Sequence, residues 1–153
     1  MKKLLPIALS ALLLLGGCSS SSSSSAAEDP VEKYGSNTLK LFTWGEYLGE
    51  NVIQNFEKQY GVNVIVEYFD SNEMMYTKLQ AGDSYDVIIP SDYMIQRLIG
   101  EDMLQTIDKS LIPNMDKLTD GVKNLAFDPD NDYSVPYFWG TVGIVYNKEN
   151  VPE

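Results

Sequence analysis

Apolar runs and helix-like stretches alternate along the chain between residues 37 and 100. The runs that read as strands, because they are rich in β-branched and aliphatic residues, are 37–43, 62–69 and 87–89. The stretches that read as helices, each followed by a glycine, are 50–60, 74–81 and 94–99. This β-α-β-α-β-α order predicts an α/β fold in which right-handed crossovers join parallel strands of one sheet.

Individual residues predict a helix start, two core positions and a buried strand within this pattern. Asp70 and Glu73 have the spacing of a capping box, so a helix is expected to begin at Asp70. Met74 and Met75 follow, and core packing rather than a site is the expected role for both. Val87–Ile89 is apolar throughout, which predicts a strand that is covered on both faces of the sheet.

Polar and aromatic residues directly follow the first and third predicted strands, at Thr43–Tyr47 and Ser91–Tyr93. The carboxyl ends of parallel strands meet at one edge of a sheet, which is where such folds bind ligands. The rings of Trp44 and Tyr47 attract positive charge and the carboxylate of Glu46 pairs with it, so this corner suits an organic cation. The alternative is that both rings are core aromatics beside a helix start.

The pattern is less regular after residue 100. Met103–Ile107 is expected to form a short extended piece, and Asn114 to cap a short helix. The Asp- and Pro-rich segment 128–132 predicts a turn rather than a calcium loop, because the glycine and glutamate that an EF-hand requires are absent from their positions. Two further extended segments are expected at 133–138 and 141–146.

The N-terminus has the features of an export signal. Residues 1–17 combine a basic start with an apolar core that is too short for an ordinary membrane span. Cys18 follows two small residues and resembles the lipidation site of bacterial lipoproteins; the alternative is a plain signal peptide with an incidental cysteine. The serine run that follows predicts a flexible tether over 18–36. These features predict an extracytoplasmic protein, at the cell surface or in the periplasm, that is anchored to a membrane through lipid on Cys18.

Charge and composition narrow the classes of function. The 153-residue chain carries a net charge of −11, which disfavours nucleic acid and other anionic partners and favours cationic ligands. It has no histidine, so histidine-based catalysis is excluded, and with it most zinc and copper sites. Cys18 is the single cysteine, so no disulfide forms within the chain. No cofactor and no metal is expected.

Four motifs recur here in an order and at a spacing that are familiar. They are Phe42–Tyr47, Ser71–Leu79, Tyr85–Tyr93 and Tyr133–Gly140. Together they resemble the spermidine- and putrescine-binding proteins of bacterial ABC transporters. The resemblance implies the α/β fold of a type II periplasmic binding protein, whose two lobes close on a ligand about a hinge. Because members of this family are more than twice as long, it implies most of the first lobe at 37–132, and the hinge crossing with the start of the second lobe at 133–153.

By similarity, the first lobe's half of a polyamine site is expected to consist of Trp44, Glu46, Tyr47, Ser91 and Tyr93. The resemblance implies that the aromatic rings pack on the methylene chain and face the ammonium groups. It also implies that Glu46 and Ser91 accept hydrogen bonds from the ligand. The acidic residues that clamp the ligand from the second lobe in this family are not part of the chain.

Two positions depart from the family pattern. Gly45 stands where many relatives have Thr or Ser, which removes one side-chain hydrogen bond. Asp92 stands where a neutral residue is common, and it either adds a ligand carboxylate or caps the following helix. The resemblance thus implies a receptor, not an enzyme, that delivers a polyamine to an ABC permease. The alternatives are a receptor for another small solute, an exported enzyme, and an adhesive or structural lipoprotein.

Overall fold

Three parallel strands form the centre of the molecule in a computed structural model, which describes residues 29–151. The strands are β1 (Thr38–Trp44), β2 (Asn63–Phe69) and β3 (Val87–Ile88), in the order β2-β1-β3. Trp44 at the end of β1 is in register with Phe69 at the end of β2, and Phe42 with Ile88 of β3. The predicted parallel sheet is therefore confirmed, and all three strands end at the same edge.

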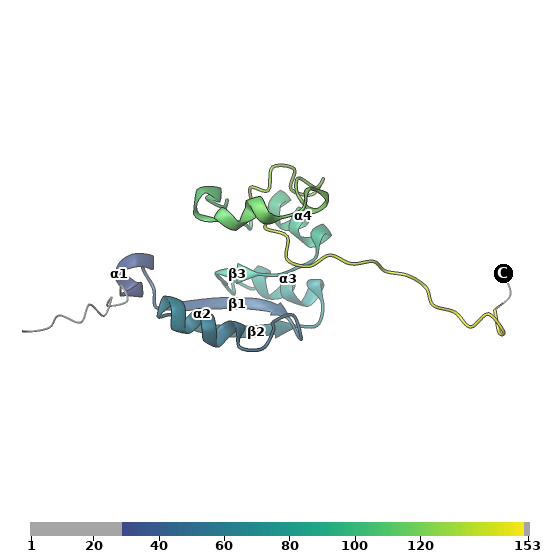
Figure 1. Cartoon of the computed structure of the whole chain (residues 1–153), viewed down its shortest axis with the longest axis horizontal. Helices are drawn as coiled ribbons and strands as arrows, with labels where there is room; N and C mark the ends of the chain where they lie inside the picture. Colours follow the sequence, from purple (N-terminus) through teal and green to yellow (C-terminus); the bar gives the residue numbers. More distant parts are fainter. Residues whose placement is uncertain (1–28, 152–153) are drawn as a thin grey trace, which may run out of the picture.

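Helices follow each strand, as the sequence pattern predicts (Figure 1). The α-helices are α1 (Pro30–Tyr34), α2 (Val52–Tyr60), α3 (Asn72–Gln80) and α4 (Asp92–Gly100), and the 3-10 turns are η1 (Lys109–Leu111), η2 (Pro113–Lys117) and η3 (Asp120–Val122). The short α1 lies inside the segment predicted to be a flexible tether. Asp29 caps it by accepting a hydrogen bond from the Val31 N–H at 2.9 Å, and Pro30 is preorganised for the first helical position.

The helix boundaries follow from caps that the sequence partly identifies. Gly61 ends α2 in the left-handed conformation, with φ of 70°, and donates its N–H to the Glu57 carbonyl. The predicted start of α3 at Asp70 is wrong by one residue. Ser71 is the N-cap, because its hydroxyl oxygen accepts the hydrogen bond from the Met74 N–H at 3.1 Å.

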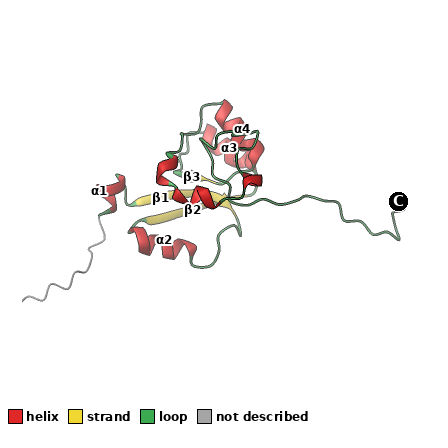
Figure 2. Ribbon diagram, turned by 45° about the horizontal axis from the view of Figure 1, so that its top comes forward, coloured by secondary structure: helices red, strands yellow, loops and turns green. Residues whose placement is uncertain are grey.

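The helices cover the two faces of the sheet unequally. Figure 2 shows α2 on one side of the sheet and α3 and α4 on the other. The core lies under α3 and α4 and contains Phe42, Phe69, Met75, Tyr76, Met94 and Leu98. Phe42 stacks on Tyr85 with ring centroids 4.4 Å apart and meets Phe69 edge-on at 4.9 Å. Met75 is fully buried as predicted, whereas Met74 is 38% exposed.

Strand β3 is not covered on both faces, which corrects the sequence prediction. Ile88 packs against the core under α3 and α4. The side chain of Val87, next along the strand, points to the opposite face and is 43% exposed. The helix on that face is α2, which packs against β2 at the far edge of the sheet.

The segment that follows α4 is held together by a buried carboxylate. Asp128 accepts hydrogen bonds from the backbone N–H groups of Asp132, Tyr133 and Ser134 and from the Ser134 hydroxyl, at 2.7–3.1 Å. The predicted turn at 128–132 is thus confirmed. Residues 103–107 form no strand, and Asn114 is not a cap: η2 begins with Pro113, whose fixed φ suits the first helical position.

The chain leaves the folded body after this turn. Residues 140–147 run away from it in an extended course, and 148–150 form a turn (Figures 1 and 2). The segments predicted to be extended at 133–138 and 141–146 pair with none of the described strands. Within residues 29–151 no helix has both the length and the apolar character needed to cross a membrane. The predicted signal peptide and Cys18 lie outside the described residues.

Candidate ligand-binding site

The first corner of the sheet edge is built by the end of β1. Trp44 is half-buried, and its ring lies 4.5 Å from that of Phe69 and 6.1 Å from that of Tyr47, measured between centroids. Trp44 therefore packs against the rim of the core while part of its ring stays accessible. The core and ligand interpretations of this residue are compatible.

Glu46 stands at the tip of the same turn. Its φ is 59°, in the left-handed region that a non-glycine residue adopts at a cost of about 1–2 kcal/mol. Its side chain is exposed, and it has no hydrogen-bond or ion-pair partner within residues 29–151. A strained turn that presents an unpaired carboxylate to solvent beside two aromatic rings suits the binding of a cation.

The corners that follow β2 and β3 are joined by the buried side-chain amide of Asn72. The Asn72 side chain donates hydrogen bonds to the Ser91 hydroxyl and to the Tyr93 phenol oxygen, both at 2.9 Å. Its oxygen accepts the Ser91 backbone N–H at 3.1 Å. Asn72 begins α3 after β2, whereas Ser91 and Tyr93 follow β3, so the bonds tie two strand ends together.

Tyr93 and Asp92 have defined roles in this corner. The Tyr93 hydroxyl donates to the Glu73 carboxylate at 2.9 Å, and the residue as a whole is 51% exposed. Asp92 accepts the N–H of Tyr93 at 2.7 Å in the first turn of α4, where a carboxylate also complements the helix dipole. Ser91 is the N-cap residue of α4, but its hydroxyl accepts from Asn72 instead of capping the helix.

A distant segment covers part of the first corner. The Tyr137 hydroxyl donates to the backbone carbonyl of Tyr47 at 2.7 Å. The ring of Phe138 meets that of Tyr47 edge-on, with centroids 5.3 Å apart. This contact holds the start of the extended segment against the strand-to-helix corner.

The structure brings the predicted site residues to one edge in two groups. Trp44 and Tyr47 are linked by ring contact, and Ser91 and Tyr93 through Asn72. The two groups follow the neighbouring strands β1 and β3, but no hydrogen bond or ring contact within residues 29–151 joins them directly.

Sequence reasoning overlooked four residues at this edge. They are Asn72, Glu73, Tyr137 and Phe138. Asn72 and Glu73 could have been predicted, because polar residues also follow the second strand at the same edge of the sheet. The contacts of Tyr137 and Phe138 with Tyr47 join positions about 90 residues apart and carry no local signal.

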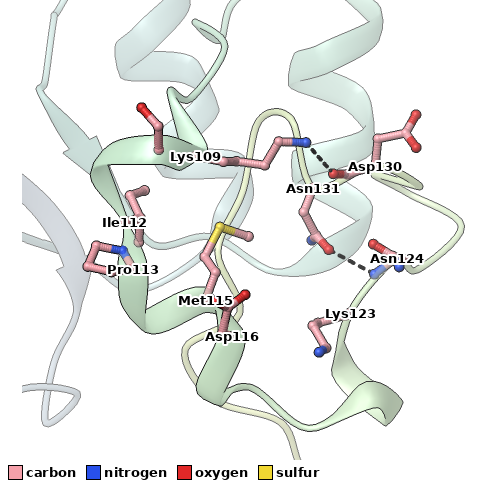
Figure 3. A pocket seen from close by; sticks show the side chains of 10 residues that line it. Lys109, Ile112, Pro113, Met115, Asp116, Lys123, Asn124, Asp130 and Asn131 are labelled. Carbon is pink, nitrogen blue, oxygen red and sulfur yellow. Dashed lines mark hydrogen bonds between the residues drawn. The ribbon is translucent and has the colours of Figure 1, made fainter.

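Two recesses are lined by none of the predicted ligand residues. The larger one, of about 430 Å³, lies between η1, η2 and the loop 123–131 (Figure 3). Lys109 on its wall is bound to the Asp130 carbonyl at 2.9 Å and to the Asp132 carboxylate at 2.6 Å, and this carboxylate raises the pKa of Lys109. None of the predicted ligand residues lines this recess, so the candidate site is not this cavity.

The smaller recess, of about 230 Å³, borders the first corner. Tyr137 and Phe138 line it and also contact Tyr47. Among the described residues, no group of three or more His, Cys, Asp or Glu side chains is placed to hold a metal ion.

Comparison with known proteins identifies the fold and the motifs. The family model of the bacterial extracellular solute-binding proteins matches residues 41–153. The spermidine/putrescine-binding periplasmic protein of Escherichia coli K12 is 40% identical over 118 residues, which is 76% of the chain and 34% of that protein. The resemblance inferred from the four motifs is confirmed.

Solved structures of proteins with related names have the same fold over this part of the chain. The spermidine/putrescine ABC transporter substrate-binding protein PotD from Streptococcus pneumoniae superimposes with a TM-score of 0.68 and 44% identity, over 76% of the chain and 36% of that protein. The TpPotD lipoprotein of Treponema pallidum superimposes with a TM-score of 0.67 and is 39% identical, over 76% of the chain and 37% of that protein. The chain therefore has the fold of part of a periplasmic binding protein, and it spans about a third of the length of the curated relative in Escherichia coli.

Proposed function

The chain belongs to the bacterial extracellular solute-binding proteins, and on this premise we propose that it captures protonated polyamines for delivery to an ABC transporter permease. Spermidine and putrescine are the expected ligands. The observation that carries the proposal is the sheet edge, where aromatic rings and an unpaired carboxylate follow parallel strands. Relatives named for spermidine and putrescine binding share this part of the sequence.

The chemistry of the edge suits a chain of methylene groups that carries ammonium groups. Trp44, Tyr47 and Tyr93 offer ring faces that pack on the methylenes and attract the charges. Glu46 and Ser91 accept N–H hydrogen bonds, and those to a charged donor are about twice as strong as neutral ones. Asp92 adds a second negative charge nearby, although its Oδ1 already accepts from Tyr93.

The proposed organisation follows the sequence. Residues 1–17 are a signal peptide, Cys18 carries lipid and begins a tether to residue 36, and 37–132 form the first lobe. Residues 133–153 form the hinge crossing and the start of a second lobe. The lipid anchor is supported by the lipobox-like sequence and by a structural relative that is itself described as a lipoprotein.

Titration of the ¹⁵N-labelled chain with putrescine and with spermidine tests the proposal. The backbone amide signals of Trp44–Tyr47 and Ser91–Tyr93 are expected to shift with both amines. Because the chain is acidic, MgCl₂ at the same ionic strength is the control for non-specific attraction of cations. Glu46→Gln is expected to weaken the response about tenfold and Glu50→Gln, an exposed position in the same loop, to leave it unchanged. Equal shifts with MgCl₂, or shifts confined to other regions, contradict it.

A further inference from the structure

Asn72 is the most highly connected polar side chain at the sheet edge, and no family motif assigned it a role in binding. It is only 4% exposed. A primary amide has two N–H groups, and those of Asn72 reach two different hydroxyl oxygens, of Ser91 and of Tyr93. Its carbonyl oxygen takes the Ser91 N–H. One buried side chain thus fixes two residues that the proposed function assigns to the ligand.

The direction of these bonds also fixes a proton. The Tyr93 oxygen accepts from Asn72, so its own hydrogen is free to donate, and Glu73 accepts it at 2.9 Å. The phenol proton is therefore committed to Glu73 and is not offered to a ligand. Ser91, which also accepts from Asn72, keeps a second lone pair.

We propose that Asn72 is a positioning residue of the cation site, an inference that rests on the proposed function. It holds Ser91 and Tyr93 in register across two strand-to-helix corners and orients the Tyr93 hydroxyl so that its proton faces Glu73. A ligand at this corner then meets the exposed ring of Tyr93 and an acceptor oxygen of Ser91. The ring favours an ammonium group, and a ligand carboxylate finds no phenol proton to accept.

Asn72→Ala is the test, with Asn131→Ala as the matched control. Asn131 is as deeply buried, at 3% exposed, and its side chain also accepts a backbone hydrogen bond, but in the 124–134 turn away from the sheet edge. Without ligand, Asn72→Ala is expected to speed hydrogen exchange of the Ser91 amide at least tenfold and Asn131→Ala to leave it unchanged. With spermidine as the probe, Asn72→Ala is expected to weaken the response at Ser91 and Tyr93 about tenfold. Asn131→Ala is expected to bind as the unsubstituted chain does, even if both variants unfold more easily.

A double-mutant cycle separates positioning from a general loss of structure. If Asn72 acts through Tyr93, Asn72→Ala and Tyr93→Phe together weaken spermidine binding by clearly less than the product of the two single losses. Independent, multiplicative losses would overturn the inference, as would an Asn72→Ala chain with unchanged affinity. An unsubstituted chain that gives no shift with spermidine contradicts the proposed function itself. A normal response in the unsubstituted chain that survives Asn72→Ala contradicts only the positioning role.

Discussion

Neighbouring residues at the end of β1 serve opposite faces of the sheet. Phe42 and Trp44 point toward the core under α3 and α4, and the side chain between them, Thr43, points to the other face. Thr43 is fully buried, and its hydroxyl has no hydrogen-bond partner within the described part of the chain. An unsatisfied buried hydroxyl costs free energy that an isosteric methyl group does not.

Thr43→Val is therefore expected to stabilise the fold. Valine keeps the shape and the β-branch and removes the unpaired hydroxyl, so we expect the free energy of unfolding to rise by about 1 kcal/mol. Urea unfolding of the chain measures it. Thr38→Val is the control on the same strand, because the Thr38 hydroxyl donates to the Asn37 side chain at 3.2 Å and its loss should bring no gain. A destabilised Thr43→Val would contradict the assignment and mean that the hydroxyl is satisfied.

The residue types at the sheet edge could be predicted, but their partners could not. The rule that ligands bind at the carboxyl ends of parallel strands pointed to Trp44, Glu46 and Tyr93, because the residue types after a strand can be read from the sequence. That the Ser91 hydroxyl accepts from an amide on another corner depends on the register of β2, β1 and β3, which is a property of the folded sheet. Whether these residues contact a ligand stays a prediction.

At the scale of elements, boundaries with a steric cause were predictable. Gly61 and Gly82, both at positive φ, placed the ends of α2 and α3 within one residue, whereas Gly100 is the last residue of α4 and not its cap. The start of α3 was missed because Asp70 and Ser71 are both good capping residues, and only the observed bond to Met74 decides between them. The exposure of Val87 could not be predicted, because composition does not say that α3 and α4 share a face.

A cluster of three polar side chains braces these elements across the core face. The carboxylate of Glu67 on β2 accepts from the Tyr85 hydroxyl at 2.8 Å and from the Lys78 ammonium at 3.1 Å. Burial, followed by the hydrogen bond to Glu67, raises the pKa of Tyr85 to about 12. The hydrogen bond from Tyr85 and then the one from Lys78 lower the pKa of Glu67. The cluster thus joins β2, α3 and the entry to β3.

The raised pKa of Tyr85 predicts a loss of stability in alkali. The folded state holds the phenol proton more tightly than the unfolded chain, whose tyrosines titrate near pH 10. The contribution is complete below about pH 10 and disappears as the pH rises to about 12. Chemical unfolding at pH 9, 10, 11 and 12 is expected to show a steeper fall for the unsubstituted chain than for Tyr85→Phe.

Tyr60→Phe is the control for this measurement. The Tyr60 side chain is exposed on α2, and its hydroxyl makes no hydrogen bond within residues 29–151. This variant should retain the full alkaline slope, because Tyr85 and Glu67 are untouched. Identical slopes for all three proteins would show that Tyr85 does not contribute to the pH dependence.

At the scale of the whole molecule, the candidate site is accessible to solvent, because its residues are half-buried or exposed. None of the residues predicted from the sequence lines either recess, and Tyr137 and Phe138, which line the smaller one, reach over the first corner at Tyr47. The chain also spans about a third of the length of the curated relative in Escherichia coli. A solvent-accessible site leaves ammonium groups in contact with water, where a cation–π contact is worth about 0.5–1 kcal/mol instead of 2 or more.

These magnitudes predict weak binding by the chain alone. A dissociation constant of 1 mM requires about 4 kcal/mol, and 1 μM about 8 kcal/mol. Three half-exposed rings and one solvated carboxylate supply at most about 4 kcal/mol of binding free energy, because ordering a flexible polyamine opposes binding. Calorimetry with residues 18–153 is expected to detect no spermidine binding tighter than about 1 mM, while amide shifts still map weak contact to the sheet edge. Submillimolar affinity would contradict the prediction, because it would mean that this face binds the cation without a second wall to exclude water.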